Sequence, residues 1–297
     1  MAKPRALLTG RSGFTGRYVT CELEQAGYEV FGLSNHGEGG ALGSIRADLL
    51  DREAMRLAVE AVRPDVVLHL AAIAFVAHGD VDEMYRVNVV GTRNLLEALA
   101  ASSKKPEVVI LASSANIYGN AKVEPITEDT PPAPANDYAV SKLAMEYMAR
   151  LWMDKLPIVI TRPFNYTGVG QSEQFLIPKI VAHFKRRDQT IELGNTDVIR
   201  DFSDVRDVAR SYRRIAEKKP VGQIFNLCGG VGHSLDDVIA MMVDIAGYQI
   251  TKQINPAFVR ANEVHRLVGS NSRFRSAMNL QTTIPLNETL AWMYSGD

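Results

Sequence analysis

Hydrophobic runs and amphipathic segments alternate through the first half of the chain. The runs without polar alternation cover residues 6–8, 28–33, 66–70, 108–111 and 158–160. Such runs are typical of strands that are covered on both faces of a sheet. Amphipathic segments, among them residues 82–101 and 138–153, lie between the runs. This alternation predicts an α/β fold with a doubly wound parallel sheet.

The rhythm changes after Arg162-Pro163. Residues 165–170 form a turn-rich segment, which precedes a predicted helix over 175–185 and a short strand over 190–193. A strand-like segment, 223–227, is expected to return to the sheet. We therefore predict a first domain and a smaller, interleaved C-terminal one. Their expected boundaries are 1–165 with returning segments near 198–228, and 166–197 with 229–297.

Composition narrows the function classes. The 297 residues are 46% hydrophobic, enough to fill a sizeable core. Lys plus Arg (33) balances Asp plus Glu (34), so we expect no nucleic-acid partner. We see neither a signal-peptide pattern nor an apolar stretch of membrane-spanning length, and expect a cytoplasmic protein without a membrane partner. Cys21, Cys228 and the histidines lack metal-ligand spacing, so we predict no metal site and two buried cysteines.

A glycine-rich loop follows the first predicted strand. It consists of Gly10, Arg11, Ser12, Gly13, Phe14, Thr15 and Gly16. The first glycine permits a tight turn, the second lets the backbone approach a pyrophosphate, and the third allows close packing of helix on sheet. The following helix N-terminus offers N–H donors to an anion. The first domain is therefore predicted to be Rossmann-like and to bind a dinucleotide, leaving the second to bind substrate.

The end of the second strand favours one form of the cofactor. An acid that binds the ribose 2′-OH is usual about 20 residues after the glycines, whereas this chain has Ser34-Asn35-His36. Arg11 could pair with a 2′-phosphate, so NADP(H) is favoured and NAD(H) remains possible. Asn35 is counted with the cofactor residues, as are Asp48 and Leu49, which close a third short strand beside the expected adenine.

Tyr138 and Lys142 stand four residues apart, on one face of a predicted helix. The lysine charge stabilises a phenolate and so suits the tyrosine to proton transfer. Ser113-Ser114 follows the strand at 108–111, at the carboxyl edge where ligands of such sheets bind. A serine hydroxyl there can hydrogen-bond a substrate oxygen.

These motifs resemble, in kind and order, the extended short-chain dehydrogenase/reductases of the NAD-dependent epimerase/dehydratase family. The matching segments are the glycine loop, 113–119, Tyr138 to Lys142, 162–165 and 200–202. The resemblance covers essentially the whole chain. It implies that Ser114 polarises a sugar oxygen, that Tyr138 is the general acid/base, and that Lys142 binds the nicotinamide ribose and tunes Tyr138.

Other candidate residues complete the predicted site. For the cofactor they are Leu70, Ala71, Ala72, Ala112 and Pro163, beside Tyr138 and Lys142; for the substrate they are Asn116, Asn165 and Lys179, beside Ser114.

The reaction is narrowed by Asn116. Nucleotide-sugar 4,6-dehydratases resemble the chain but carry an acid, usually glutamate, at the matching position, because water elimination needs a further acid and base. Reductases, which consume NAD(P)H, and 4-epimerases, which recycle tightly bound NAD, remain. The preference for NADPH favours reduction. A non-catalytic dinucleotide sensor is a third alternative, disfavoured by the intact Ser114, Tyr138 and Lys142.

The substrate class is indicated by residues 259–264. This segment resembles the R-P-x-E-V element of the GDP-mannose dehydratase branch, with Ala261 where proline is usual. The resemblance implies that Arg260 binds the sugar-nucleotide diphosphate and Glu263 the nucleotide ribose. Arg200 is a second candidate phosphate clamp, since arginine offers planar bidentate donors.

Taken as a whole, the chain resembles GDP-4-keto-6-deoxymannose reductases. This implies NADPH-dependent reduction of the C4 keto group of a GDP-linked 4-keto-6-deoxy sugar, of rhamnose type or a heptose analogue, in nucleotide-sugar biosynthesis for surface polysaccharide. A homodimer is also expected, because segments 82–101 and 138–153 occupy the positions that pair into a four-helix bundle in related proteins.

Overall fold

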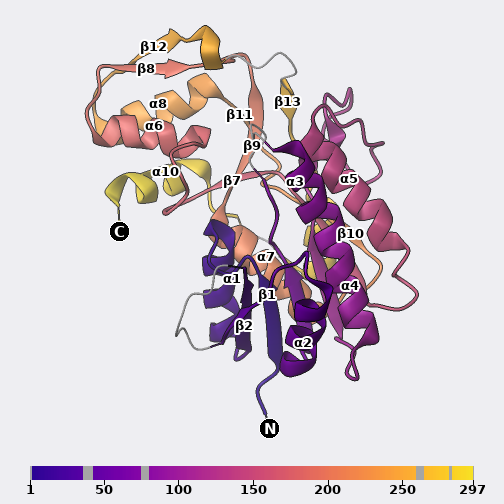
Figure 1. The fold of residues 1–297 in the computed structure, drawn as a ribbon. Coiled ribbons are helices and arrows are strands. Elements are labelled where there is room, and N and C mark those ends of the chain that lie inside the picture. The colour runs from indigo at the N-terminus through magenta and orange to yellow at the C-terminus, as the bar shows by residue number, and fades with distance from the viewer. Residues whose placement is uncertain (1, 36–42, 75–79, 259–263, 281–282, 297) are drawn as a thin grey trace. The chain divides into compact units, whose positions relative to one another are not determined.

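The structure is a computed structural model, and it describes residues 2–35, 43–74, 80–258, 264–280 and 283–296. The chain forms two compact units (Figure 1). The first consists of Met1–Ile117, Asn136–Arg162 and Ala209–Phe225, and the second of Tyr118–Ala135, Pro163–Val208 and Asn226–Asp297. The roles predicted for the two parts of the chain remain predictions.

A seven-stranded sheet lies at the centre of the first unit. Its strands, in spatial order, are β10 (Ile224–Leu227), β6 (Ile158–Pro163), β5 (Val108–Ala112), β4 (Val66–His69), β1 (Arg5–Thr9), β2 (Glu29–Ser34) and β3 (Ser44–Arg46). The ladders from β6 to β3 are parallel. Chain order reverses at β1, and ligands of such sheets bind beyond the carboxyl ends at this point. The predicted Rossmann-like fold is confirmed, and residues 224–227 do return to the sheet.

Burial explains why these strands lack alternation. All four residues of β4 and the first four of β5 are buried, so both faces of these strands favour apolar side chains. The helices α2 (Arg52–Val62), α4 (Thr92–Ala101) and α5 (Asp137–Arg150) contribute to one hydrophobic cluster with the strands. The helix α1 (Phe14–Gln25) packs on β1 and β2, and α7 (Val205–Lys218) is shared by the two units.

The helix predicted over 82–101 is three elements instead of one. A short α3 (Val81–Tyr85) leads into a π-helical turn, η1 (Arg86–Gly91), which continues as α4. The wide turn carries Asn88, whose side chain accepts from the N–H of Ile73 (2.9 Å) and donates to its carbonyl (3.1 Å). These two hydrogen bonds to a residue outside the helix stabilise the wider turn, and the hydrophobic periodicity of the sequence gives no sign of them. π-helical turns are frequent at functional sites.

The second unit has two small sheets and a helical layer. One sheet joins β11 (Gly232–Ser234), β9 (Ile199–Asp204), β13 (Arg266–Leu267) and β7 (Asn165–Thr167), and β8 (Thr190–Leu193) pairs with β12 (Thr251–Ile254). The helices α6 (Leu176–Lys185), α8 (Leu235–Ala246) and α10 (Leu286–Ser295) share a hydrophobic cluster. Shorter helical elements are η2 (Ala115–Tyr118), η3 (Pro256–Phe258) and α9 (Ser272–Met278).

One expectation about the cysteines is wrong. Cys228 is buried as predicted, but Cys21 is exposed on α1, where its Sγ accepts from Gln25 Nε2 at 3.2 Å. It falls on the solvent side because the buried face of α1 is set by Val19, Thr20 and Leu23. Within the described ranges, no group of three or more metal-ligating side chains comes together. The helices seen in these ranges also fall short of the length and apolarity that crossing a bilayer requires.

Candidate active site

The glycine loop turns directly beyond the end of β1. Gly10 has φ of +74°, and a Cβ there would lie 2.9 Å from the Ala71 nitrogen. A Cβ on Gly16 would lie 2.1 Å from the Gly10 carbonyl oxygen. Both positions therefore require glycine for the loop to hold its shape. The first turn of α1 follows at Gly13, which makes no side-chain cap bond, so its N–H groups are suited to a pyrophosphate.

A cavity of about 380 Å³ lies beside this loop and the end of β2. It is lined by Arg11, Ser12, Arg17, Thr20, Gly32, Leu33, Ser34 and Ser44. None of these lining residues, all in the described part of the chain, carries a carboxylate. Two guanidinium groups and several hydroxyls are instead available, which is the donor set a phosphate prefers.

Arg11 and Arg17 are held by different partners in this cavity. Arg11 lies over Gly32, where a Cβ would come within 2.5 Å of its Cδ. Its Nη2 is 3.5 Å from Glu24 Oε1, in a partly exposed ion pair of the kind that contributes little stability. Arg17 Nε donates to the Ser12 carbonyl at 3.1 Å. Arg17 and Ser44 were not predicted from the sequence. A signal for Arg17 was present, since helical side chains point back toward the helix N-terminus.

The other predicted cofactor residues lie at or near the carboxyl ends of the strands. Asn35 is exposed just after β2, and Leu70 and Ala71 follow β4, with the Ala71 N–H donating to Thr9 Oγ1 at 3.1 Å. Asp48 is exposed and its Oδ1 accepts from the Leu50 N–H at 2.8 Å, as an ordinary turn aspartate does. Leu49 packs against the hydrophobic cluster. The remaining members are Ala72 after β4, Ala112 ending β5 and Pro163 ending β6.

The three predicted catalytic residues belong to the end of β5 and the first half of α5. Ser114 is 6% exposed, and its Oγ accepts from the Asn116 backbone N–H at 3.2 Å. Tyr138 lies in the first turn of α5 and is 8% exposed. Lys142, one turn later, is also buried, and its Nζ donates to the Ala112 carbonyl at 2.8 Å. This bond ties the middle of α5 to the end of β5, beside Ser114.

Burial sets the acidity of Lys142. Because water is excluded from its ammonium group, the pKa of Lys142 is lowered to about 8, with the Glu146 carboxylate opposing the shift. Glu146 accepts from Arg162 through both carboxylate oxygens. Glu146 was not predicted from the sequence, although its position four residues after Lys142 places it on the same face of α5.

His69 is the buried core residue that its strand position predicts. Its Nδ1 lies 2.7 Å from Thr9 Oγ1 and its Nε2 2.8 Å from Thr92 Oγ1. Burial, together with the Lys142 charge, lowers the pKa of His69 to about 3, so the imidazole is neutral. A neutral histidine adds no second positive charge next to Lys142.

The predicted substrate residues divide between the units. Asn116 is in the first unit, and in the second Asn165 is exposed on β7. Arg200 on β9 is 9% exposed, and its Nη1 donates to the Ile199 carbonyl at 3.1 Å. Arg260 and Glu263 lie outside the described residues.

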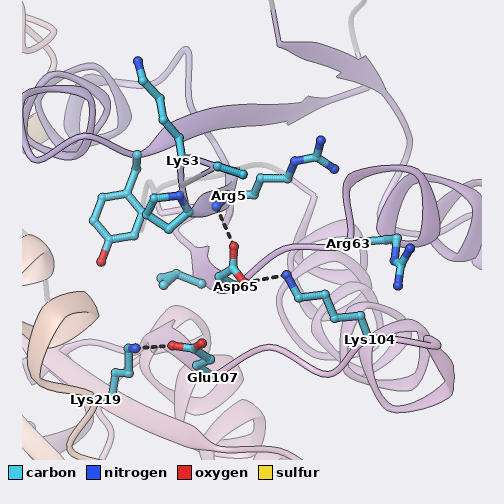
Figure 2. A pocket seen from close by; sticks show the side chains of 11 residues that line it. Lys3, Arg5, Arg63, Asp65, Lys104, Glu107 and Lys219 are labelled. Atoms are coloured by element: carbon cyan, nitrogen blue, oxygen red, sulfur yellow. Dashed lines mark hydrogen bonds and ion pairs between the residues drawn. The ribbon is translucent and has the colours of Figure 1, made fainter.

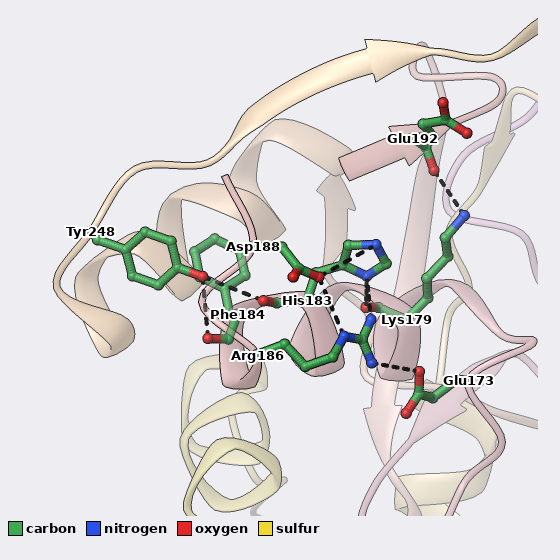
Figure 3. A network of polar contacts seen from close by, with 8 residues as sticks. All are labelled: Glu173, Lys179, His183, Phe184, Arg186, Asp188, Glu192 and Tyr248. Atoms are coloured by element: carbon green, nitrogen blue, oxygen red, sulfur yellow. Dashed lines mark hydrogen bonds and ion pairs between the residues drawn. The ribbon is translucent and has the colours of Figure 1, made fainter. Parts of the chain in front are cut away.

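Lys179 is engaged within a polar network on α6 (Figure 3). Its Nζ donates to the Glu192 carbonyl at 2.8 Å and lies 4.3 Å from the centre of the Phe258 ring. The neighbouring Arg186 pairs with Glu173 and Asp188. A role for Lys179 toward a phosphate therefore requires it to exchange the Glu192 carbonyl for the ligand.

Asp201 anchors the strand that carries Arg200. Its carboxylate accepts from the N–H groups of Gly229 and Gly230, each at 2.8 Å. Burial raises the pKa of Asp201 to about 6, against the lowering effect of these bonds. The two glycines follow β10 in the chain, so this carboxylate fixes the β9 backbone beside Arg200.

A parallel sheet with a glycine loop at its switch point, followed by a serine at the end of β5 and a Tyr-x-x-x-Lys pair on α5, defines a nicotinamide-dependent enzyme. The family model described as "NAD dependent epimerase/dehydratase family" matches residues 6–228. The chain belongs to this family, whose members act on nucleotide sugars with a nicotinamide cofactor.

Two curated relatives cover nearly the whole chain. GDP-6-deoxy-D-talose 4-dehydrogenase of Aggregatibacter actinomycetemcomitans is 33% identical, over 92% of this chain and 91% of its own. GDP-6-deoxy-D-mannose reductase of Pseudomonas aeruginosa is 32% identical, over 96% and 94%.

Two solved structures are also similar. A candidate epimerase from Burkholderia cenocepacia J2315 is 51% identical with a TM-score of 0.93, and covers 99% of this chain and 98% of its own. The structure of RMD from Pseudomonas aeruginosa, complexed with NADPH, is 30% identical with a TM-score of 0.86, over 99% and 98%.

Proposed function

We propose that the protein is an NADPH-dependent reductase of the C4 keto group of a GDP-linked 4-keto-6-deoxy sugar. The observation that carries this proposal is the cavity at the end of β2, whose described lining residues include Arg11 and Arg17 but neither Asp nor Glu. A carboxylate there would repel a 2′-phosphate, whereas two guanidinium groups attract it. A cofactor that carries the 2′-phosphate suits an enzyme that consumes added NADPH.

The chemistry assigned to the site follows from its groups. When bound, the nicotinamide supplies a hydride to the carbonyl carbon. Ser114 holds the carbonyl oxygen by a hydrogen bond, and the Tyr138 Oη gives its proton to that oxygen as it becomes an alkoxide. The Lys142 ammonium favours the resulting phenolate. The product is a secondary alcohol at C4.

The names of the two curated relatives support the substrate class. Both contain a GDP-linked 6-deoxyhexose. 6-Deoxytalose and 6-deoxymannose differ only in their configuration at C4, so oxidation at C4 converts both to the same 4-keto sugar. A common keto substrate therefore suits this chain, whichever face of the carbonyl receives the hydride.

The direct test measures NADPH oxidation with a dehydratase-generated GDP-4-keto-6-deoxy sugar, beside its dTDP and UDP counterparts and a heptose analogue. We expect stoichiometric loss of NADPH with the GDP-linked substrate. Competition calorimetry should rank GDP above UDP and dTDP. Equal use of all three nucleotides would remove the GDP assignment, and the absence of oxidation with any keto sugar would remove the reductase.

A nucleotide-sugar 4-epimerase is the second candidate, favoured by the candidate epimerase that is 51% identical to this chain. An epimerase returns the hydride to the same sugar, so it should purify with bound NAD and act without added cofactor. A reductase should instead purify free of NAD and require NADPH.

We also propose that the chain forms a homodimer through α5 and η1. Val140, Tyr147 and Leu151 lie along or just beyond α5 and are 39%, 54% and 79% exposed, and Val90 on η1 is 44% exposed. Covering this apolar surface would stabilise a symmetric pair. A Leu151→Asp variant should then be monomeric in light scattering where the wild type is dimeric. A monomeric wild type at micromolar concentration would contradict the proposal.

A further inference from the structure

Three buried ionisable side chains lie on α5 and at the end of β6. Lys142, Glu146 and Arg162 are 4%, 0% and 3% exposed. Arg162 Nε donates to Glu146 Oε1 at 2.9 Å and Arg162 Nη2 to Oε2 at 2.7 Å. This fork uses both oxygens of the carboxylate, so it fixes where the negative charge lies.

The buried Glu146–Arg162 ion pair is not needed if its only role is to stabilise the fold. Removing two charges from water carries a large free-energy penalty for each ion, and a well-packed apolar pair of similar volume is often as stable or more so. The surroundings are apolar: α5 contributes Met145 and Ala149 to the hydrophobic cluster, together with Ile158 and Ile160 of β6. The position of Glu146, one turn after Lys142 on the same face, indicates what the charge is for.

We propose that Glu146, held in place by Arg162, is a positioning residue that keeps the Lys142 side chain charged and directed at the end of β5. The inference rests on the proposed function, in which Lys142 serves Tyr138. Glu146 acts through Lys142, and Arg162 acts through Glu146.

Electrostatics support this assignment. Burial alone drives Lys142 toward its neutral form, and Glu146 is the charge that opposes it. With a pKa of about 8, Lys142 is mostly protonated near neutral pH. Without the carboxylate, the pKa would fall further, and the retained Arg162 cation would add repulsion. The ammonium that Tyr138 requires would then be lost within the working pH range.

The other titratable groups around Lys142 do not replace Glu146. His69 on β4 is neutral, and Tyr138 is the group that Lys142 serves. The helical elements in contact with α5 are α3, η1 and α4, and β5 and β6 reach it through the Ala112 carbonyl and Arg162. The charged or titratable groups of the three helical elements are exposed or partly exposed: Asp82, Glu83, Tyr85, Arg86, Arg93 and Glu97. Among the residues that the structure describes, Glu146 is therefore the buried anion that faces Lys142.

The test is a direct titration of Lys142 in the full-length protein without cofactor or substrate. Side-chain ¹⁵N signals of labelled lysines are followed by NMR against pH, and Lys142→Met identifies the signal. We expect a pKa of about 8 in the wild type. In Glu146→Gln, the pKa should fall by about 1 unit or more. Glu146→Asp keeps the charge at a shorter reach, so it should restore part of the shift.

Two further variants keep the test decisive. If Glu146→Gln does not fold, the double variant Glu146→Leu/Arg162→Met replaces the pair with apolar side chains and should still lower the pKa of Lys142. Asp65→Asn is the matched control, because it removes the carboxylate partner of Lys104 at the other edge of the same sheet. It should leave the pKa of Lys142 unchanged. An unchanged Lys142 pKa in every folded Glu146 variant would overturn the proposal.

A pH profile separates this inference from the proposed function. Reduction needs Tyr138 and Lys142 both protonated, so the alkaline limb of kcat/KM should move to lower pH in Glu146→Gln by the same amount as the Lys142 pKa. If no keto sugar is reduced while the NMR shift is present, the proposed function fails and the role of Glu146 stands. If reduction is observed and neither the limb nor the NMR pKa moves, Glu146 is only structural.

Discussion

Lysine side chains at the two edges of the seven-stranded sheet have pKa values shifted in opposite directions. At the carboxyl edge, Lys142 is buried against the end of β5, and its pKa is lowered to about 8 by loss of water. At the amino edge, Lys219 is partly exposed and pairs with Glu107 (Figure 2). The hydrogen bond to this carboxylate raises the pKa of Lys219. Burial decides the sign, because it penalises the charged form more than one carboxylate can offset.

The difference assigns separate tasks to the two edges. The amino edge holds a cavity of about 500 Å³ lined by several cations and two carboxylates (Figure 2). Arg5 there donates to the Val62 carbonyl in the last turn of α2, and Arg63 follows as the cap of that helix. Cations at helix C-termini complement the dipole and the unpaired carbonyls. These charges support helix ends, whereas the proposed function assigns the buried Lys142 at the carboxyl edge to proton transfer by Tyr138.

Replacing Tyr138 should produce the largest effect. Tyr138→Phe removes the transferable proton and keeps the ring, so turnover should fall by roughly 10²–10⁴-fold. NADPH affinity should change little, since the substitution removes only the transferable proton and its oxygen. Steady-state kinetics and fluorescence titration of NADPH measure the two quantities. Tyr147→Phe, an exposed position on the same helix, is the control and should retain activity. Near-wild-type turnover in Tyr138→Phe would contradict the catalytic assignment.

Lys142→Met should stabilise the fold while it abolishes activity. The pKa of Lys142 falls from 10.5 in the unfolded chain to about 8 in the folded one. Between these values the unfolded state binds more protons, so stability rises with pH and the full cost applies below pH 8. Removing the charge should therefore raise the free energy of unfolding by up to about 3 kcal/mol at pH 7. The Ala112 carbonyl loses its donor, which offsets part of this gain.

Urea unfolding at pH 7 and above pH 10.5 measures the effect of Lys142→Met. The gain should be present at the lower pH and should vanish at the higher one, where the wild-type lysine is neutral in both states. Lys104→Met at the amino edge is the comparison, and should give no stabilisation at either pH. If Lys142→Met destabilises the protein at pH 7, burial is not what lowers the pKa of Lys142.

The sheet could be predicted from the sequence, as could the place of Tyr138 and Lys142 on one helix, because each left a local pattern. Uninterrupted apolar runs indicated the buried strands, and spacing placed Tyr138 and Lys142 on one face. What it could not predict depends on contacts far apart in the chain. The π-helical turn at Asn88 is stabilised by hydrogen bonds to the Ile73 backbone. Ser44 and Arg17 line the same cavity only because β3 pairs with β2. Arg162 belongs to a recognisable motif, but its bond to Glu146 needed the packing of α5 on β6.

The Arg17→Ala variant tests whether the cavity at the carboxyl edge binds the 2′-phosphate of NADPH. If the cavity beside β2 holds the 2′-phosphate, loss of one guanidinium should weaken NADPH by about tenfold, close to one charged hydrogen bond. NADH, which lacks that phosphate, should bind as it does to the wild type. Arg11→Ala should act in the same direction, and the Glu24 carboxylate that loses Arg11 as a partner should add repulsion toward the phosphate. Calorimetry with both cofactors measures the selectivity, and equal weakening of NADPH and NADH would show that the phosphate lies elsewhere.

Asp65→Asn at the amino edge should have the smallest effect. Burial raises the pKa of Asp65, but its bonds to the Lys104 ammonium and the Arg5 backbone N–H outweigh this and lower it overall. The pair is partly exposed, so its loss should cost no more than about 1 kcal/mol of unfolding free energy at neutral pH. Because the folded pKa is depressed, this contribution is present above the unfolded pKa and disappears as pH falls through the folded one. Salt should also weaken the contribution of this pair.

Urea unfolding at neutral and low pH, each at low and high salt, measures the pH trend and the salt trend. Turnover should be unchanged in Asp65→Asn. If Asp65→Asn lowered the free energy of unfolding by several kcal/mol at both salt concentrations, the Asp65–Lys104 pair would be as shielded from water as Lys142. The difference in solvent exposure between the two edges of the sheet would then be refuted.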